Sequence, residues 1–158
     1  MDTIVLCPFS DADIPLLAAW LDKEYIKKWY HDPDEWLREV QNRHGEFRFL
    51  NHFIVTYTSK PIGFCQYYAC EDAKEEWYQG IPLAGSYSID YLIGEEEFLG
   101  KGLGKSIIAA LVEKIFSLSG AQRIVVQPEE ENKASCNALL SNGFYFDEAN
   151  SLYQKDRA

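Results

Sequence analysis

A glycine-rich stretch constrains this chain more than any other feature. The run Leu99-Gly100-Lys101-Gly102-Leu103-Gly104-Lys105-Ser106 separates a strand-like segment from an amphipathic helix. Glycines at alternate positions let the backbone turn tightly and approach a ligand closely, because they carry no Cβ. The following helix offers N–H groups without an intrahelical partner and the positive end of its dipole. The stretch therefore predicts a loop that binds an anion, such as a phosphate, through backbone amides.

Spacing excludes two well-known phosphate-binding loops. A P-loop has four residues between its first glycine and its Gly-Lys-Ser/Thr ending, whereas three residues separate Gly100 from Gly104. A dinucleotide-binding G-x-G-x-x-G motif needs glycine at Lys105, and too little chain follows for a Rossmann unit. A glycine-rich turn that only ends a strand stays open as the alternative, since isolated glycine motifs are weakly specific.

Length and composition predict one folded domain. A chain of 158 residues is long enough to bury a hydrophobic core, so we expect a single domain over residues 1–158. Hydrophobic residues make up 47% and aromatic residues 15%, which excludes disorder, and no apolar run is long enough to span a membrane. The start, Met1-Asp2-Thr3, lacks the basic flank and apolar core of a signal peptide, which predicts a cytoplasmic protein.

The charged and metal-ligating residues narrow the range of partners. A net charge of −10 disfavours nucleic acid, whose phosphates need a basic face, and suits a small cationic molecule. No cysteine pair has C-x-x-C spacing and no histidine has the spacing of a metal ligand, so we expect reduced thiols and no metal site. The residues concerned are Cys7, Cys65, Cys70 and Cys136, and His31, His44 and His52.

Hydrophobic periodicity predicts an alternating order of strands and helices. Strands are expected over residues 3–8, 53–57, 62–70, 86–93, 123–127, 144–146 and 152–153, with a polar loop over 71–85. Helices are expected after Ser10-Asp11-Ala12-Asp13, from about Asp32, from the glycine loop to about Ser119-Gly120, and from Asn132 to Asn142-Gly143. This order predicts an α/β (α+β) fold with a central mixed sheet and helices on both faces.

This order resembles the GNAT acyltransferases over nearly the whole chain, with the glycine loop after the fourth strand and Asn132-x-x-Ser135 opening the next helix. The resemblance implies a mostly antiparallel sheet of about six to seven strands, in which strands four and five splay apart. It also implies acetyl-coenzyme A as cofactor, with its pyrophosphate on the loop amides and its pantetheine arm between the splayed strands. The implied cofactor-binding residues are Tyr91, Leu92, Ile93, Leu99, Gly100, Lys101, Gly102, Leu103, Gly104, Lys105, Asn132 and Ser135.

Within that superfamily, the chain is most similar to the aminoglycoside 6′-N-acetyltransferases. Three segments carry this resemblance: Ser88-Ile89-Asp90-Tyr91-Leu92-Ile93 before the loop, Pro61-Ile62-Gly63-Phe64-Cys65-Gln66-Tyr67-Tyr68, and the tryptophan-containing Trp20-Leu21 and Lys28-Trp29-Tyr30. The strand-four aspartate of those enzymes is assigned to the acceptor amine, and Asp90 takes this role by position. The resemblance implies acetyl transfer to the 6′-amine of an aminoglycoside, an antibiotic-resistance activity, by a monomer or homodimer.

The chemistry of amine acetylation explains why a carboxylate is needed. The acceptor amine is mostly protonated at neutral pH, so a carboxylate must hold the cation and take its proton, directly or through water. An ordinary aspartate is a weak base, so we expect burial to raise the pKa of Asp90, or a water to relay the proton. Strict alternation along the strand puts Asp90 on the face of Ser88 and Leu92, opposite Ile89 and Tyr91.

Two further requirements are a polarised thioester carbonyl and an exit for the thiolate. Backbone N–H groups around residues 91–93 are expected to polarise the carbonyl. Leu139 stands where many relatives carry a tyrosine thought to protonate the departing thiolate. The general acid is therefore not assigned; solvent and another tyrosine are both open.

Acidic and aromatic residues cluster in the segments that suit a cationic acceptor. Carboxylates beside aromatic faces bind ammonium groups well. We expect the acceptor to contact Trp29, Tyr30, Asp32, Gln66, Tyr68, Glu76, Trp77 and Asp90. The alternative for each is a solvated loop acid or a half-buried aromatic ring and, for Asp90, a hydrogen-bonded structural carboxylate.

Two other functions stay open. The first is the same chemistry on another amine, such as a polyamine, a hydroxylamine-bearing siderophore precursor or a protein N-terminus. The second is a non-catalytic acyl-coenzyme A sensor, which only the leucine at position 139 favours.

Overall fold

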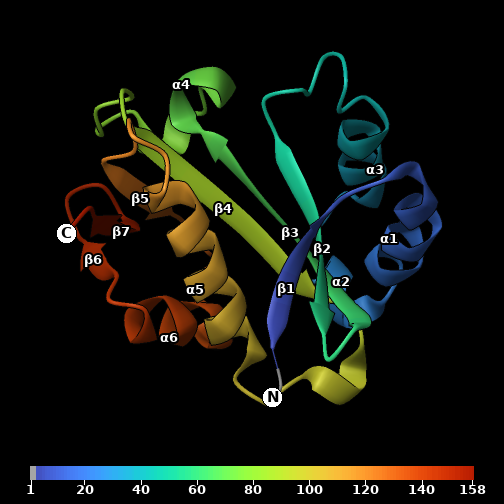
Figure 1. Ribbon diagram of the computed structural model, residues 1–158. Helices are drawn as coiled ribbons and strands as arrows, with labels where there is room; N and C mark the ends of the chain where they lie inside the picture. The colour runs from blue at the N-terminus through green and yellow to red at the C-terminus, as the bar shows by residue number, and fades with distance from the viewer. Residues whose placement is uncertain (1–2) are drawn as a thin grey trace.

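The computed structural model describes residues 3–158 (Figure 1). The predicted cytoplasmic location was drawn from Met1-Asp2-Thr3, and Met1 and Asp2 lie outside the described residues. The elements are β1 (Ile4–Pro8), α1 (Ile14–Leu21), α2 (Glu24–Lys27), α3 (Pro33–Gln41), β2 (Asn51–Tyr57), β3 (Lys60–Ala69), α4 (Cys70–Ala73), β4 (Ser86–Ile93), α5 (Leu103–Phe116), β5 (Arg123–Val126), α6 (Lys133–Ser141), β6 (Tyr145–Asp147) and β7 (Leu152–Asp156). Within residues 3–158, no helix has the length and apolar character needed to cross a membrane.

The strands form a seven-stranded mixed sheet in the order β1-β2-β3-β4-β5-β7-β6. All neighbours run antiparallel except β4 and β5, which are parallel. The prediction of a mixed, mostly antiparallel sheet is therefore confirmed. So is the predicted splay, because β4 and β5 pair only at Ser86 with Arg123 and at Tyr87 with Ile124. Beyond this point β4 continues to Ile93 while β5 ends at Val126.

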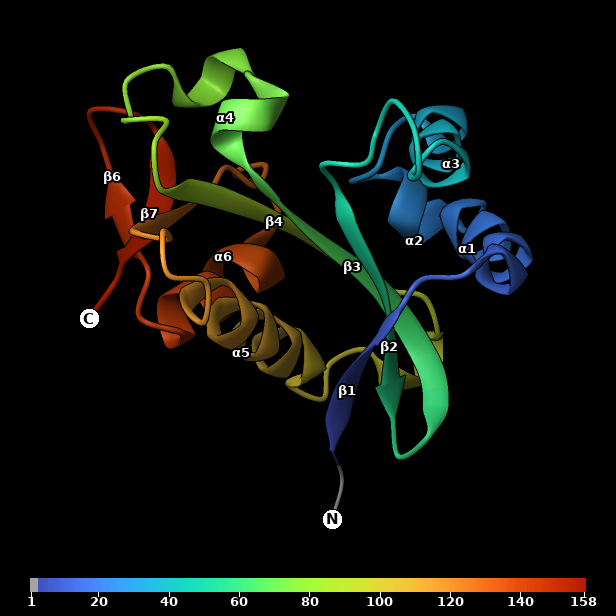
Figure 2. The same cartoon turned by 45° about the horizontal axis from the view of Figure 1, so that its top comes forward.

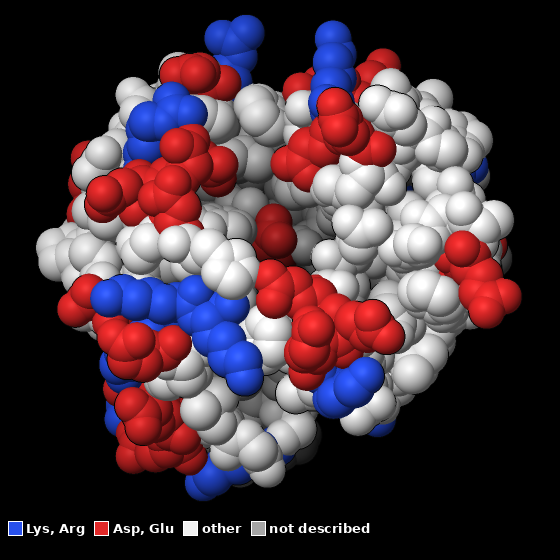
Figure 3. Space-filling model, turned by 180° about the vertical axis from the view of Figure 1, so that it is seen from behind, with Lys and Arg blue, Asp and Glu red and all other residues white. Residues whose placement is uncertain are grey.

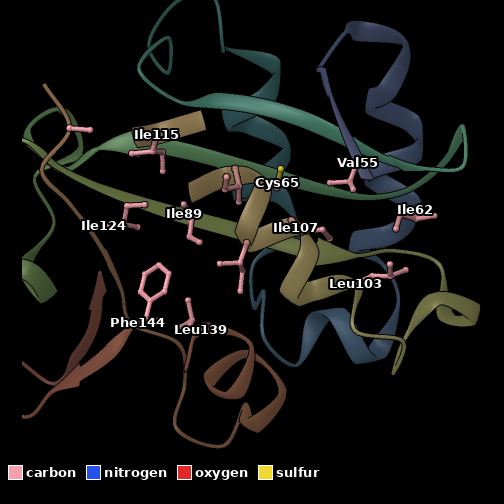
Figure 4. Close-up of a cluster of buried hydrophobic side chains, with 13 residues drawn as sticks. Val55, Ile62, Cys65, Ile89, Leu103, Ile107, Ile115, Ile124, Leu139 and Phe144 are labelled. Carbon is pink, nitrogen blue, oxygen red and sulfur yellow. The ribbon is translucent and has the colours of Figure 1, made fainter. Parts of the chain in front are cut away.

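The larger hydrophobic core lies between the sheet and α5 (Figure 4). Helix α5 forms because its apolar side chains recur at helical spacing, and Ile107, Ile108, Leu111 and Ile115 are all fully buried. Each such side chain contributes about 1.5–3 kcal/mol relative to an exposed one. Leu139 of α6 joins the same cluster.

A second core covers the opposite face of the sheet (Figure 2). Leu17 and Trp20 of α1 and Val40 of α3 pack there with Phe64 of β3 and Leu92 of β4. Helices therefore lie on both faces of the sheet, as predicted.

Three local predictions were wrong. The segment 71–85, predicted as a polar loop, includes all of α4 except its first residue, Cys70, and a 3₁₀ turn over 76–78; α2 was not predicted. Helices of four residues are too short to show a period of 3.6 in the sequence. The strand predicted over residues 62–70 begins two residues earlier, at Lys60, because the hairpin turn lies at Thr58 and Ser59, which both have positive φ.

Gly94 provides a test of how tightly the second core is packed. An added Cβ at Gly94 would lie 2.1 Å from the indole of Trp20, whose Nε1 donates to Glu95 Oε2 at 2.6 Å. We expect Gly94→Ala to lower the free energy of unfolding by about 2 kcal/mol, because the buried ring cannot move away freely. Urea denaturation measures this change.

The matched control is Gly120→Ala, since nothing lies within 4 Å of the added Cβ. We expect this variant to change the free energy of unfolding by less than about 0.5 kcal/mol. Equal losses in the two variants would contradict the close contact between Gly94 and Trp20.

Candidate active site

Two cavities adjoin each other where β4 and β5 diverge. The larger is about 510 Å³ and the smaller about 430 Å³. The two linings share five residues: Trp29, Tyr30, Tyr91, Asn132 and Ser135. Figure 3 shows this side of the molecule hollowed at its centre, with acidic side chains around the opening and an acidic side chain deep inside. The carboxylates that line the larger cavity are those of Glu39, Glu75, Asp90 and Glu129.

The glycine loop forms one wall of the smaller cavity. Gly100 and Gly102 have φ values of +72° and +75°, and Gly102 is the N-cap of α5. Side chains rarely adopt this conformation, so glycine is required there. The space beside both residues is open, since nothing lies within 4 Å of an added Cβ. The amides of the first turn of α5 have no intrahelical acceptor, so the loop has the geometry of an anion site.

Most of the predicted cofactor-binding residues line this smaller cavity. They are Tyr91, Leu92, Ile93, Leu99, Gly100, Gly102, Leu103, Gly104, Lys105, Asn132 and Ser135. Lys101 is the exception, because it is not part of the cavity lining. Its ammonium group lies over the ring of Phe98, 5.9 Å from the ring centre. Asn132 caps α6 by accepting from the Ser135 amide at 3.2 Å, and the Tyr91 hydroxyl lies 3.3 Å from Ser135 Oγ.

Tyrosine hydroxyl groups bind the edge of β4 that β5 leaves open. Tyr30 donates to the carbonyl oxygen of Tyr91, and Tyr25 donates to that of Ile93 at 2.8 Å. The N–H and C=O of one strand residue point to the same side, so the amides of Tyr91 and Ile93 face this edge as well. Burial, followed by the charge of Asp90, raises the pKa of Tyr30 well above its usual range, which keeps the hydroxyl protonated.

Asp90 lies opposite Gln66 of β3 and lines the larger cavity. The Gln66 amide Nε2 donates to Asp90 Oδ2 at 2.8 Å. Leu92 packs in the core under α1 and α3, whereas Ile89 packs toward α5. The predicted alternation of faces along β4 is therefore confirmed.

Burial raises the pKa of Asp90 to about 7, the Gln66 hydrogen bond opposes the shift, and the charge of Glu75 adds to it. The expectation of a raised pKa is thus met. Burial also raises the pKa of Glu39 to about 7, with further contributions from Asp90, Glu35 and Glu75. Near neutral pH the two carboxyl groups are therefore divided between neutral and charged forms.

The larger cavity contains six of the eight residues predicted for the acceptor: Trp29, Tyr30, Gln66, Tyr68, Trp77 and Asp90. The other two residues lie outside the lining of this cavity. Asp32 is the N-cap of α3 and accepts from the Glu35 amide at 3.3 Å, which directs its carboxylate to the helix end. Glu76 is exposed in the 3₁₀ turn, outside the lining of the cavity.

Several lining residues were missed. Glu39 and Trp36 lie three residues apart, so both belong to one face of α3, and this spacing was the available signal. Glu75 was not among the predicted acceptor contacts, yet its charge acts on both Asp90 and Glu39. Phe47 and Phe49, in the segment before β2, carry no periodic pattern that would have marked them.

Leu139 is fully buried in the α5 core (Figure 4). No proton donor therefore exists at the position where many relatives carry a tyrosine. All four cysteines are free, and the linings of the two cavities include neither cysteine nor histidine. Within residues 3–158, no three His, Cys, Asp or Glu side chains come together in a way that could hold a metal ion.

Comparison with known proteins agrees with this geometry. Residues 10–152 match the family described as Acetyltransferase (GNAT) domain. The aminoglycoside N(6′)-acetyltransferase type 1 of Klebsiella pneumoniae is 26% identical over 149 residues, which cover 90% of this chain and 74% of that protein, and a relative from Serratia marcescens has the same values. The solved structure of aminoglycoside acetyltransferase AAC(6′)-Ib in complex with coenzyme A has a TM-score of 0.86 at 23% identity, covering 98% of this chain and 95% of that chain.

The fold and its paired cavities are those of an acyltransferase. Because the family match spans most of its length, the chain belongs to the GNAT acetyltransferase family. It is accordingly an N-acetyltransferase, and acetyl-coenzyme A is its acyl donor.

The raised pKa of Asp90 has a consequence for stability. A carboxyl group with a pKa near 4 when unfolded and about 7 when folded binds more protons in the folded state, so stability falls as pH rises between these values. Asp90→Asn removes this dependence. We expect the free energy of unfolding of the variant, relative to that of wild type, to rise by about 3 kcal/mol from about pH 4.5 to about pH 8.

Urea denaturation across this pH range measures the difference. Glu39 titrates in both proteins, but its pKa is lower in the variant because the charge of Asp90 is gone, so the measured difference includes a smaller contribution from Glu39 in the same direction. A difference that stays constant with pH would show that Asp90 has an ordinary pKa.

Proposed function

We propose that the chain acetylates a primary amine of a polycationic small molecule, with the 6′-amine of an aminoglycoside as acceptor. The observation that carries this proposal is the position of Asp90. Its carboxylate lies deep in a cavity of carboxylates and aromatic rings, and its neighbour Tyr91 lines the glycine-loop cavity as well. The activity named for the Klebsiella and Serratia relatives supports the choice of acceptor.

The smaller cavity suits the acyl donor. Backbone amides at the start of α5 bind the diphosphate, because they combine free N–H groups with the positive end of the helix dipole. Lys101 and Lys105 add positive charge near this position. Tyr91, Leu92 and Ile93 border the pantetheine arm, with Asn132 and Ser135 beside them, in agreement with the lining of the cavity. When bound, acetyl-coenzyme A supplies the acetyl group as an activated thioester.

The open edge of β4 suits the carbonyl to be attacked. The amides of Tyr91 and Ile93 face the gap between β4 and β5, whereas the carbonyls of the same residues accept from tyrosine hydroxyl groups. A backbone N–H fixed in this way stabilises developing negative charge on an oxygen without reorganising. We infer that one of these two amides polarises the thioester carbonyl.

Asp90 acts on the acceptor amine. Its carboxylate holds the ammonium group and takes one of its protons, directly or through a water, so that the nitrogen lone pair becomes free to attack. A pKa of about 7 suits this role, because the carboxylate is then both substantially ionised and a useful base at neutral pH.

The other carboxylates favour an acceptor with several positive charges. Glu39 and Glu75 share the cavity with Asp90; the charge of Glu75 raises the pKa of both other carboxyl groups, and that of Asp90 raises the pKa of Glu39. Additional ammonium groups relieve this repulsion, and the rings of Trp29 and Trp77 provide faces on which cations bind. An acceptor with a single positive charge, such as a peptide N-terminus, can neutralise only one of these carboxylates.

The departing thiolate takes its proton from solvent or from another tyrosine, because position 139 offers no donor. Leu139 has no exchangeable proton and lies in the core. A thiol with an ordinary pKa near 8.5 leaves readily as the thiolate at neutral pH. The carbon–sulfur bond can therefore break before the sulfur is protonated, so a dedicated acid is not essential.

An acceptor panel tests the proposed substrate. We expect thiol release from acetyl-coenzyme A to be at least about tenfold more efficient in kcat/KM with kanamycin than with spermidine or with a peptide bearing a free N-terminus, because kanamycin offers more ammonium groups to the cavity carboxylates than either of them. Expression in a susceptible bacterial host is expected to raise the inhibitory concentration of kanamycin. A preference for spermidine or the peptide would replace the aminoglycoside as acceptor, and coenzyme A binding without turnover of any amine would indicate a sensor.

Asp90→Asn tests the proposed base. We expect this variant to lower kcat with kanamycin at least about tenfold, because the amide cannot accept the proton. Its dissociation constant for acetyl-coenzyme A, measured by calorimetry, is expected to stay within about twofold of wild type. Near-normal turnover would remove Asp90 from the mechanism.

A further inference from the structure

Three polar side chains form a row across adjacent strands of the sheet. His52 of β2 is the register partner of Gln66 of β3, and Gln66 is the partner of Asp90 of β4. Register partners project to the same face, so the three side chains are direct neighbours. His52 and Gln66 are 7% and 2% exposed, which places the row in the protein interior up to the cavity wall.

The hydrogen bonds along this row are incomplete. Gln66 Nε2 donates to Asp90 Oδ2 at 2.8 Å, but Gln66 Oε1 and both ring nitrogens of His52 are buried without a hydrogen-bond partner. Buried polar atoms without partners are rare in native proteins. The unpaired acceptor of Gln66 and the unpaired imidazole of His52 lie side by side, so a small rotation pairs them.

The chemistry of His52 fits this pairing. Burial and then the charge of Arg43 lower the pKa of His52 to about 4, while interaction with the Gln66 side chain acts in the opposite direction. At neutral pH the imidazole is therefore neutral and carries one N–H donor. The ring is held between aromatic neighbours, since its centroid lies 5.7 Å from that of Phe64 in a stacked arrangement and 6.2 Å from that of Phe9.

The orientation of the Gln66 amide matters for Asp90. With its N–H₂ toward the carboxylate, Gln66 favours the charged form; turned by a half rotation, its oxygen would face the carboxylate and disfavour that form. A donor on the far side of Gln66 selects the first orientation. His52 is the residue in place to provide it.

We propose that His52 is a positioning residue for acetyl transfer: its ring N–H donates to Gln66 Oε1 and so fixes the Gln66 N–H₂ on Oδ2 of Asp90. Oδ1 is then left for the acceptor amine. The inference rests on the proposed role of Asp90 as base. The other groups that act on this row are Glu75, Glu39, Tyr30 and Tyr68 around Asp90, and Arg43 beside His52.

The test is His52→Phe, which keeps a ring between Phe9 and Phe64 but removes the donor. Carbon-13 NMR of the carboxyl groups, in protein without substrates, follows the titration of Asp90. We expect the variant to raise the pKa of Asp90 by about one unit. At pH 7 this shift lowers kcat/KM for kanamycin about fivefold, and the loss disappears at about pH 9, where Asp90 is charged in both proteins.

Restored donors and a matched control separate positioning from a structural effect. The amide groups of His52→Asn and His52→Gln overlie Nδ1 and Nε2 of the imidazole, so at least one of these variants is expected to return the pKa of Asp90 toward the wild-type value. His44→Phe, at an exposed histidine between α3 and β2, is expected to leave the titration and kcat/KM unchanged.

The outcomes are distinct. A pKa of Asp90 within about 0.2 units of wild type in His52→Phe overturns the proposal. A shifted pKa in a protein that acetylates no amine supports the positioning role and rejects the proposed function. If His52→Phe does not fold, nitrogen-15 NMR of the wild-type imidazole decides: one slowly exchanging ring N–H that Gln66→Leu abolishes supports the pairing, and mixed tautomers in wild type overturn it.

Discussion

The divergence of β4 from β5 is the constraint on which the site depends. Their parallel pairing ends at Tyr87, so backbone groups farther along β4 have no strand neighbour on that side within the described residues. Buried backbone groups need hydrogen-bond partners. Tyr25 and Tyr30 satisfy two carbonyls of this edge, and the rest of it borders the cavities. In the proposed mechanism, the acyl donor binds to this strand edge, next to the carboxylate of Asp90, which acts on the acceptor.

The electrostatics of the acceptor cavity follow from this geometry. Asp90, Glu39 and Glu75 surround one space, and the protein supplies few opposing groups: Gln66 for Asp90 and Arg38 for Glu39. Carboxylates in such surroundings resist ionisation, which makes the free protein less stable at neutral pH and makes a cationic ligand favourable. Within the row of His52, Gln66 and Asp90, Gln66 supplies the opposing hydrogen bond at the residue that we propose as the base.

The sequence predicted those features that follow from local rules. Alternation along one strand determined the face of Asp90, positive φ required glycine at Gly100 and Gly102, and an Asx cap marked Asn132. Features that depend on pairing between distant segments could not be predicted from the sequence. The neighbours of Gln66 become known only from the register of three strands, and Glu39 reaches the cavity only because α3 packs over the sheet. Asp32 was predicted to contact the acceptor but is a helix cap, because aspartate is common both at helix N-termini and as a ligand for cations.

A crystal structure with coenzyme A and ribostamycin bound together tests whether the two substrates meet where β4 and β5 diverge. We expect the diphosphate to lie on the amides of residues 102–105, the thiol to lie in the gap between β4 and β5, and an amine of the aminoglycoside to lie within hydrogen-bonding distance of Asp90. A diphosphate bound away from the glycine loop, or an aminoglycoside whose amines all lie far from Asp90, would contradict the account.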